Sequence, residues 1–406
     1  MESIITIITK NYLAFARTLA NSYKEHHPNG HMFVLIADHV DDFFDPYAEN
    51  FTPILLDELR HEVKHLDQML FKYSVVELCT ALKPFVLKHI LNKYQFKEIA
   101  YIDPDILVMD TLDPLSELLK EHNIVLTPHI LKPYGDNKQP TELRILQAGS
   151  FNLGFIALAN RPASLAMLEW WKEKLYNQCI MDQDGLFVDQ KWVDLVPGLF
   201  EGTYILRHPG YNAAYWNLHD REITQAKNTY FCNGETLRFF HFSGYDIENP
   251  NEISKWQNRH LLEELPALKT LFQTYRKLLN NNKHTAIKHW PYAFNLFHGE
   301  HIPISNFLKR IYLNTPNNER FGNTFEEIKN QFTHYLLSSD DNKLPPVLSI
   351  LFEAQRRSDQ QHILTGLVKI LRLDLMPGML LAKDQPKKLT NFIKKVYSLV
   401  HPSESQ

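Results

Sequence analysis

The chain of 406 residues has only three cysteines, Cys79, Cys179 and Cys232, and they lie far apart. An odd number of widely spaced cysteines provides neither a disulfide framework nor a cysteine-based zinc site. No apolar run approaches the roughly 20 residues of a membrane span, and the N-terminus lacks the basic start and cleavage site of a signal peptide. Lys and Arg (43) nearly balance Asp and Glu (47), so no positive excess suits nucleic acid. These absences predict a cytoplasmic, globular protein without a nucleic-acid partner.

Glycine-rich phosphate-binding loops are also absent. The stretch from Thr6 to Arg17 contains no glycine, and no Walker-type or Gly-x-Gly-x-x-Gly sequence occurs anywhere in the chain. Because nucleotide-binding enzymes of several classes hold phosphates with such loops, their absence disfavours nucleotidyltransferase and simple kinase chemistry.

Apolar runs alternate with amphipathic segments over the first 130 residues. Strands are expected at residues 3–9, 32–37, 98–102, 106–109, 123–127 and 237–242, and residues 151–159 form a further apolar segment. Helices are expected at 12–26, at 68–94 with an interruption at Lys83-Pro84, and at 164–176. This alternation predicts an α/β fold in which helices cover both faces of a mostly parallel sheet. The helical, proline-punctuated pattern that follows predicts a catalytic domain over 1–270 and a helical C-terminal region over 271–406.

Two carboxylates stand at the end of one expected strand. In residues 101–107 (YIDPDIL), Asp103 and Asp105 are two positions apart, so both side chains would share one face if the strand continued. Mg²⁺ and Mn²⁺ take oxygen ligands of this kind together with substrate phosphates. A solvated turn is the alternative interpretation.

A histidine among aromatic residues provides a third candidate ligand. In residues 239–246 (FFHFSGYD), His241 is followed by Gly244, which could let the main chain approach a phosphate closely. A half-buried core histidine is the alternative interpretation.

Polar residues within apolar segments suggest a sugar pocket. Asn152 and Gln190 could bind sugar hydroxyls, and Asp189 could face a cationic carbon or simply lie in the first turn of a helix. Lys83 could bind a phosphate as a point charge, or it could be a surface residue. The aromatic residues of 208–217 (HPGYNAAYWN) could form a sugar platform or a packed loop.

Taken in order, ITIITKNY, ALKPFVL, YIDPDILV, FNLGFIAL, VDQKWVD and FFHFSGYD resemble the retaining GT-A glycosyltransferases of the glycogenin and bacterial lipopolysaccharide galactosyltransferase type. The resemblance covers about residues 1–250. It departs from the family at Pro104, inside the Asp-x-Asp, and after Gly244, where the Lys-Pro-Trp of the family is missing. The departures indicate a divergent bacterial branch with the GT-A fold, a Rossmann-like mixed sheet flanked by helices, and a helical C-terminal extension.

The resemblance implies roles for individual residues. Asp103, Asp105 and His241 would hold Mn²⁺ (or Mg²⁺) against the diphosphate of a nucleotide sugar, with a UDP-sugar as the expected donor. Lys83 and Gly244 would contact the diphosphate or the donor sugar. Thr9 and Tyr12 would lie near the base and ribose of the nucleotide. The sugar pocket and the reaction centre would contain Asn152, Asp189 and Gln190.

The acceptor is left open between a saccharide, a lipid-linked glycan and a protein. A basic amphipathic segment at residues 387–400 would suit the inner face of a membrane, or it could pack on its own domain.

Two other classes compete with this reading. His61-Glu62-Val63-Lys64-His65 formally matches the His-Glu-x-x-His helix of zinc proteases, although Lys64 would place a positive charge between the ligands. A catalytically inactive nucleotide-sugar-binding or scaffold protein on the same fold is the second alternative. The loss of a metal ligand would favour it, but both aspartates and the histidine are present.

Overall fold

The computed structural model describes residues 1–181, 185–295, 304 and 306–337. The chain divides into two compact units, of which the larger contains residues 1–64 and 75–292 and the smaller contains residues 65–74 and the chain from Ala293 onward. The larger unit therefore extends beyond the division expected near residue 270.

A seven-stranded sheet forms the centre of the larger unit, in the order β3–β2–β1–β4–β7–β6–β8. Its strands are β1 (Ser3–Ile8), β2 (His31–Ile36), β3 (Thr52–Leu55), β4 (Glu98–Ile102), β6 (Ile124–Pro128), β7 (Phe151–Ala159) and β8 (Thr203–Ile205). Six of them run in one direction, and only β7 runs against its neighbours β4 and β6. The predicted mixed, mostly parallel sheet is confirmed.

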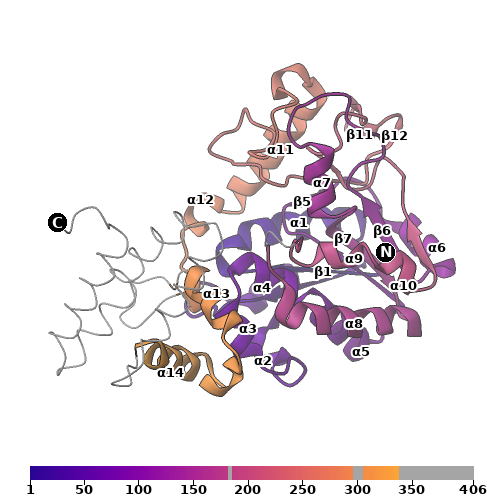
Figure 1. The fold of residues 1–406 in the computed structure, drawn as a ribbon. Helices are drawn as coiled ribbons and strands as arrows, with labels where there is room; N and C mark the ends of the chain where they lie inside the picture. The colour runs from indigo at the N-terminus through magenta and orange to yellow at the C-terminus, as the bar shows by residue number, and fades with distance from the viewer. Residues whose placement is uncertain (182–184, 296–303, 305, 338–406) are drawn as a thin grey trace. The chain divides into compact units, whose positions relative to one another are not determined.

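Helices flank this sheet, and alternate strand residues face different helices. The helices of the larger unit are α1 (Leu13–His26), α2 (Leu56–Leu59), α4 (Val75–Ala81), α5 (Lys83–Tyr94), α6 (Asp113–Glu121), α7 (Glu142–Ala148), α8 (Pro162–Gln178), α9 (Gln190–Val193), α10 (Val196–Leu199), α11 (Pro266–Asn281) and α12 (His284–Ile287). Ile4, Ile8 and Val34 belong to one core with α1 and α6. Helices α5 and α8 lie side by side, and α5 packs on β4 (Figure 1).

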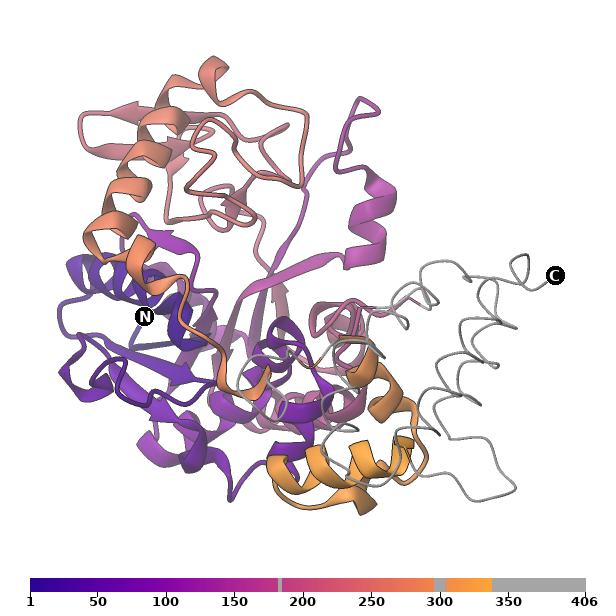
Figure 2. The same ribbon diagram turned by 90° about the vertical axis from the view of Figure 1, so that its left-hand side faces the viewer.

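Two small sheets complete the larger unit. The first has the order β5–β13–β9, from β5 (Ile106–Val108), β13 (Phe239–His241) and β9 (Ala213–Ala214). The second is a ribbon of β10 (Ile223–Ala226), β11 (Thr229–Cys232) and β12 (Glu235–Thr236), and α11 packs beside it (Figure 2). Short 3₁₀ turns occupy Lys10–Tyr12, Pro46–Ala48 and Leu262–Glu264.

The helical pattern expected at 68–94 is present but broken into α3 (Leu66–Lys72), α4 and α5. Helix α5 begins at Lys83 with Pro84 in its first turn, where the missing N–H of proline costs no hydrogen bond. The interruption at Lys83-Pro84 is thus a new helix start and not a kink. The extra break between α3 and α4 was not expected from the sequence.

The smaller unit gathers α3 with α13 (Asn306–Asn314) and α14 (Phe325–Leu337) and with the 3₁₀ turns Ala293–Asn295 and Asn318–Phe321. Its core is aromatic, because the Phe71 ring packs at right angles to Tyr312 and Phe332, at 4.9 and 6.0 Å between centroids. The basic segment at 387–400 lies outside the described residues. Among the helices that are described, none combines the length and apolar character needed to cross a bilayer.

The central sheet makes a direct stability prediction. Leu126 lies on β6 and is fully buried, whereas Leu143 lies on α7 and is 64% exposed. We expect Leu126→Ala to lower the free energy of unfolding by about 2–5 kcal/mol through lost burial and the cavity that remains. Leu143→Ala, the matched control, should change it by less than about 0.5 kcal/mol. Urea unfolding followed by circular dichroism measures both, and equal effects would contradict the assigned sheet core.

Candidate active site

Asp103 and Asp105 lie in the turn that follows β4, not on a continuing strand as the sequence argument assumed. The Ile106 N–H donates to the Asp103 carbonyl at 3.2 Å, which closes the turn around Pro104. The Asp103 N–H donates to the Gly154 carbonyl on β7 at 2.8 Å. The turn therefore brings the carboxylates together in place of strand alternation, at the carboxyl end of a central strand, where α/β sheets bind their ligands.

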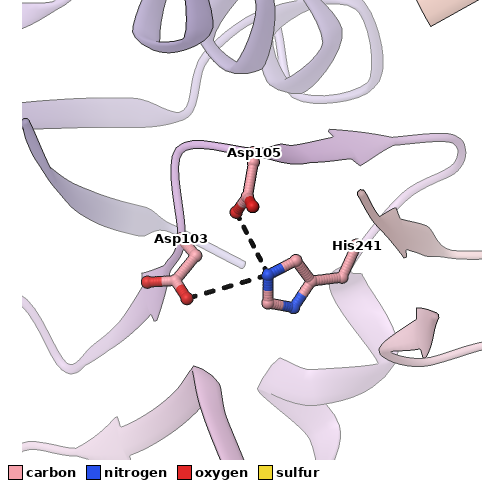
Figure 3. A group of neighbouring side chains, drawn as sticks. All are labelled: Asp103, Asp105 and His241. Carbon is pink, nitrogen blue, oxygen red and sulfur yellow. Dashed lines mark ion pairs between the residues drawn. The ribbon is translucent and has the colours of Figure 1, made fainter. Parts of the chain in front are cut away.

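His241 reaches the two carboxylates from β13. This strand pairs antiparallel with β5, so that His241 stands opposite Ile106. Its Nε2 lies 3.1 Å from Asp105 Oδ1 and 3.8 Å from Asp103 Oδ2 (Figure 3). We call Asp103, Asp105 and His241 the Asp–Asp–His group; one ligand atom from each lies within 4.8 Å of the others.

The chemistry of this group suits a hard divalent cation. Burial lowers the pKa of His241, but the negative charges of Asp105 and Asp103 outweigh this effect and raise it overall. The ring is therefore held in a field that attracts positive charge. A cation bound at about 2.1 Å places neighbouring ligand atoms about 3 Å apart; the separation between His241 and Asp105 is 3.1 Å, and that between His241 and Asp103 is wider at 3.8 Å. The two oxygens and one imidazole nitrogen thus fit Mn²⁺ or Mg²⁺.

Lys83 and Asp189 form a buried ion pair next to the Asp–Asp–His group. Both side chains are 2% exposed, and Lys83 Nζ lies 2.8 Å from Asp189 Oδ2 and 3.7 Å from Asp103 Oδ1. The ammonium also donates to the Leu153 carbonyl at 2.7 Å and lies over the Tyr101 ring. Lys83 is therefore not a surface residue. Although Asp189 stands at the N-cap of α9, its side chain makes no capping hydrogen bond.

Each charge in this ion pair favours the ionised form of the other. Burial lowers the pKa of the Lys83 ammonium, but Asp103 and Asp189 overcome this and raise it. Burial raises the pKa of Asp189, and Lys83 opposes that rise without cancelling it, so the pKa stays raised overall. The ammonium consequently stays charged and compensates two carboxylates at once.

Gly154 provides the room for the His241 ring. A Cβ atom at this position would lie 2.4 Å from His241 Cε1 and 2.8 Å from Asn152 Oδ1. Glycine is therefore required here by a close approach of side chains, although this position was not among the predicted site residues.

Asn152 and Gln190 lie beside the site, but their amides face the protein. Gln190 Nε2 donates to the Ala148 carbonyl at 2.9 Å, and its Oε1 accepts from the Leu153 N–H at 3.4 Å. Asn152 Oδ1 accepts from the Gly154 N–H at 3.1 Å. In this structure both amides brace β7.

The remaining predicted residues are more peripheral. Thr9 follows β1 and donates its hydroxyl to Asn11 Oδ1 at 2.6 Å. Tyr12 is 44% exposed as a residue and stacks on Phe15, and burial of its hydroxyl end, followed by the charge of Asp105, raises the pKa of its phenol. Gly244 has a left-handed φ of 69°, and a Cβ there would meet Trp256 and Ser254. The positive φ and the packing against Trp256 and Ser254 account for this glycine, and its contact with a phosphate stays a prediction.

Sequence reasoning missed two buried residues that bear on the site. Asn212 Oδ1 lies 3.3 Å from His241 Nδ1, and His129 Nε2 lies 3.3 Å from Asn152 Nδ2. Asn212 belongs to the aromatic segment 208–217, which the structure shows as a packed loop, since Tyr211 and Trp216 are both buried. The sequence singles out this segment by its aromatic residues, and nothing in the sequence distinguishes Asn212 as a site residue.

The zinc-protease reading is wrong for a local reason. Residues 60–65 form turns between α2 and α3, and His65 has a left-handed φ of 61°. The motif needs a helix to place both imidazoles on one face. Glu62 instead pairs with His89 Nδ1 at 2.6 Å.

The chain is similar in sequence to two proteins of Bacillus subtilis. No family model matches the chain. YfnF of Bacillus subtilis (strain 168) is 30% identical over 201 residues, covering 48% of this chain and 66% of YfnF, so that just under two-thirds of that relative is spanned. YfnD of the same strain is 25% identical over 284 residues, covering 66% of this chain and 86% of YfnD.

Solved structures that are similar to the chain include two glycosyltransferases. The galactosyltransferase LgtC, in complex with donor and acceptor sugar analogs, has a TM-score of 0.43 and 14% identity, covering 69% of this chain and 95% of LgtC. The glycosyltransferase GlyE of Streptococcus pneumoniae TIGR4 has a TM-score of 0.41 and 14% identity, covering 72% of this chain and 65% of GlyE.

The buried ion pair can be tested by a double-substitution cycle. Lys83→Met leaves Asp189 without its cation, and we expect a loss of about 3–5 kcal/mol in the free energy of unfolding. Adding Asp189→Asn removes the unpaired charge and should recover much of that loss. Urea unfolding of the wild type, both single variants and the double variant gives the coupling; purely additive effects would contradict the ion pair.

The same variant should lose more stability than the wild type as pH rises. Without Lys83, burial alone raises the pKa of Asp189, so between the unfolded pKa near about 4 and the raised folded pKa the folded chain binds a proton that the unfolded chain lacks. Stability then falls as pH rises through this window and returns as pH is lowered. Stability of Lys83→Met that rises with pH relative to wild type would rule out a charged, unpaired Asp189.

Proposed function

We propose that this chain is a metal-dependent glycosyltransferase of the GT-A type, which moves a sugar from a nucleotide-sugar donor of the UDP-sugar class to a saccharide, lipid-linked glycan or protein acceptor with retention of configuration. The convergence of Asp103, Asp105 and His241 at the carboxyl end of β4 carries the proposal. These residues arrive from two sheets and two distant parts of the sequence, and their donor set fits Mn²⁺ or Mg²⁺ better than zinc.

Charge compensation supports this chemistry. A divalent ion held by the Asp–Asp–His group would neutralise the negative charge that develops on a departing nucleoside diphosphate. Lys83 balances Asp103 and Asp189 from inside the protein. It therefore places a positive charge beside both carboxylates, in addition to any contact with the donor.

Asp189 is the residue that we propose nearest to the reacting carbon. Its carboxylate is buried and held by Lys83, so it can stabilise positive charge on a sugar ring without solvent screening. Gln190 and Asn152 bind the beginning of β7 through the hydrogen bonds described above. We propose that they position this end of the strand beside the metal site. Tyr12 is partly exposed and is therefore available to the nucleotide.

The alternative function is a catalytically inactive protein that binds nucleotide sugars on the same fold. Both readings share the donor site, and turnover distinguishes them. A cytoplasmic location at the inner face of a membrane is proposed on the basic segment at 387–400, which would suit a lipid-linked acceptor.

The reaction can be tested without knowledge of the acceptor. We expect slow release of nucleoside diphosphate from one member of a panel of UDP-, GDP- and dTDP-sugars, dependent on Mn²⁺ and abolished by chelator. Asp105→Asn, which keeps the shape of the side chain, should reduce the rate by about a hundredfold or more, as expected for a lost ligand. Asp57→Asn, a control at an exposed carboxylate that pairs with Arg60, should leave it unchanged.

Donor binding without turnover would favour the inactive-binder alternative. Absence of binding to every donor, with and without Mn²⁺, would contradict the proposed function. Release that persists in chelator would contradict its metal dependence.

The close approach at Gly154 gives an independent prediction. Gly154→Ala places a methyl group against the His241 ring and should weaken Mn²⁺ binding about tenfold or more by displacing one ligand. Gly135→Ala is a matched control, because a Cβ there meets no atom within 4 Å. Titration of free Mn²⁺ by electron paramagnetic resonance measures both, and equal affinities would show that His241 is not a ligand.

A further inference from the structure

A chain of buried hydrogen bonds runs from the far side of the His241 ring into the protein. His241 Nδ1 lies 3.3 Å from Asn212 Oδ1, and Asn212 Nδ2 donates to Asn152 Oδ1 at 3.0 Å. Asn152 Nδ2 in turn lies 3.3 Å from His129 Nε2, and His129 Nδ1 lies 2.8 Å from the Gly149 carbonyl. All four side chains are at least nine-tenths buried.

The two ends of this chain fix the direction of every hydrogen bond. The Gly149 carbonyl can only accept, so His129 Nδ1 must donate and His129 Nε2 must accept in the neutral ring. Burial lowers the pKa of His129 to about 4, which keeps that ring neutral at pH 7. Asn152 therefore turns its NH₂ toward His129 and its oxygen toward Asn212.

A second anchor agrees with this assignment. The Gly154 main-chain N–H can only donate, and it donates to Asn152 Oδ1 at 3.1 Å. Asn212 must then present its NH₂ to Asn152, and the same NH₂ donates to Thr127 Oγ1 at 2.9 Å. Its oxygen is left to face His241, so His241 Nδ1 has to carry a hydrogen.

Asn212 is itself held in place. Its φ of 53° is in the left-handed region, which asparagine tolerates better than most residues. The main-chain carbonyl of Asn212 accepts from Asn217 Nδ2 at 3.0 Å, and Asn217 Oδ1 accepts from the Ala214 N–H. The side chain consequently cannot rotate without breaking several buried hydrogen bonds.

We propose that Asn212, anchored through Asn152 and His129, is a positioning residue that keeps the hydrogen of the His241 ring on Nδ1 and so presents the Nε2 lone pair between Asp103 and Asp105. This inference rests on the proposed metal site. A metal-binding histidine commonly donates its other ring N–H to a fixed acceptor, and here that acceptor is an amide whose orientation is set from two sides.

Two variants separate positioning from packing. Asn212→Gly tolerates the left-handed backbone and removes the acceptor. Asn212→Asp retains an acceptor for His241 but, like the glycine variant, loses the donor to Asn152 and Thr127. We expect Asn212→Gly to weaken Mn²⁺ binding by about tenfold to a hundredfold, and Asn212→Asp to stay close to the wild type. Melting temperatures of both variants report the shared loss of packing.

The tautomer of His241 can be measured directly in metal-free protein. Histidine side chains are labelled with nitrogen-15, spectra are recorded in chelator at a pH where the ring is neutral, and the His241 signals are assigned with His241→Ala. We expect hydrogen on Nδ1 in the wild type and in Asn212→Asp, and a mixture of tautomers in Asn212→Gly. Hydrogen on Nε2 in the wild type, or equal losses of Mn²⁺ affinity in both variants, would overturn the proposal. Wild-type protein that binds Mn²⁺ with the expected tautomer but turns over no donor would contradict sugar transfer alone.

Discussion

A buried ammonium keeps its charge only where carboxylates and carbonyls surround it, and Lys83 meets this condition with groups from three other segments. Asp189 comes from the start of α9, Asp103 from the turn after β4, and the Leu153 carbonyl from β7. The first residue of α5 thus fixes the distance between segments that lie up to about a hundred positions apart. The rest of the site is arranged around this cation, because Asp103 shares its two oxygens between Tyr101 and Lys83 on one side and His241 on the other.

Sterics and hydrogen bonding complement each other at His241. Gly154 admits the ring, and Trp216 lies edge-on to it at 5.2 Å between centroids. The asparagines behind it decide which nitrogen carries hydrogen. The antiparallel strand β7 is central to this arrangement, since its first residues contribute Asn152, the Leu153 carbonyl and Gly154 to the site. A sheet that is otherwise parallel is therefore interrupted by the strand that supports the site.

Much of this arrangement could be predicted from the sequence because it is local. Buried strands such as Ser3–Ile8 and His31–Ile36 are indicated by short apolar runs in the sequence. The carboxylates after β4 follow directly from strand and turn residues. Long-range pairings could not be predicted in the same way. Nothing near Asn212 or His129 in the sequence indicates that they connect to His241, and the burial of Lys83 depends on a partner 106 positions away. A local match can also lack the structure that its chemistry needs, since the disfavoured His-Glu-x-x-His sequence lies in turns.

The ligands of the Asp–Asp–His group come from segments 136 positions apart, Asp105 and His241, which meet only when β5 and β13 pair. No short fragment of the chain can reproduce that meeting. A cation that requires all three ligands therefore has no comparable site in the unfolded chain, and its binding free energy is added to the stability of the folded state. The supply of metal would in that way set the resistance of the larger unit to heat and proteolysis, apart from any effect on the rate of sugar transfer.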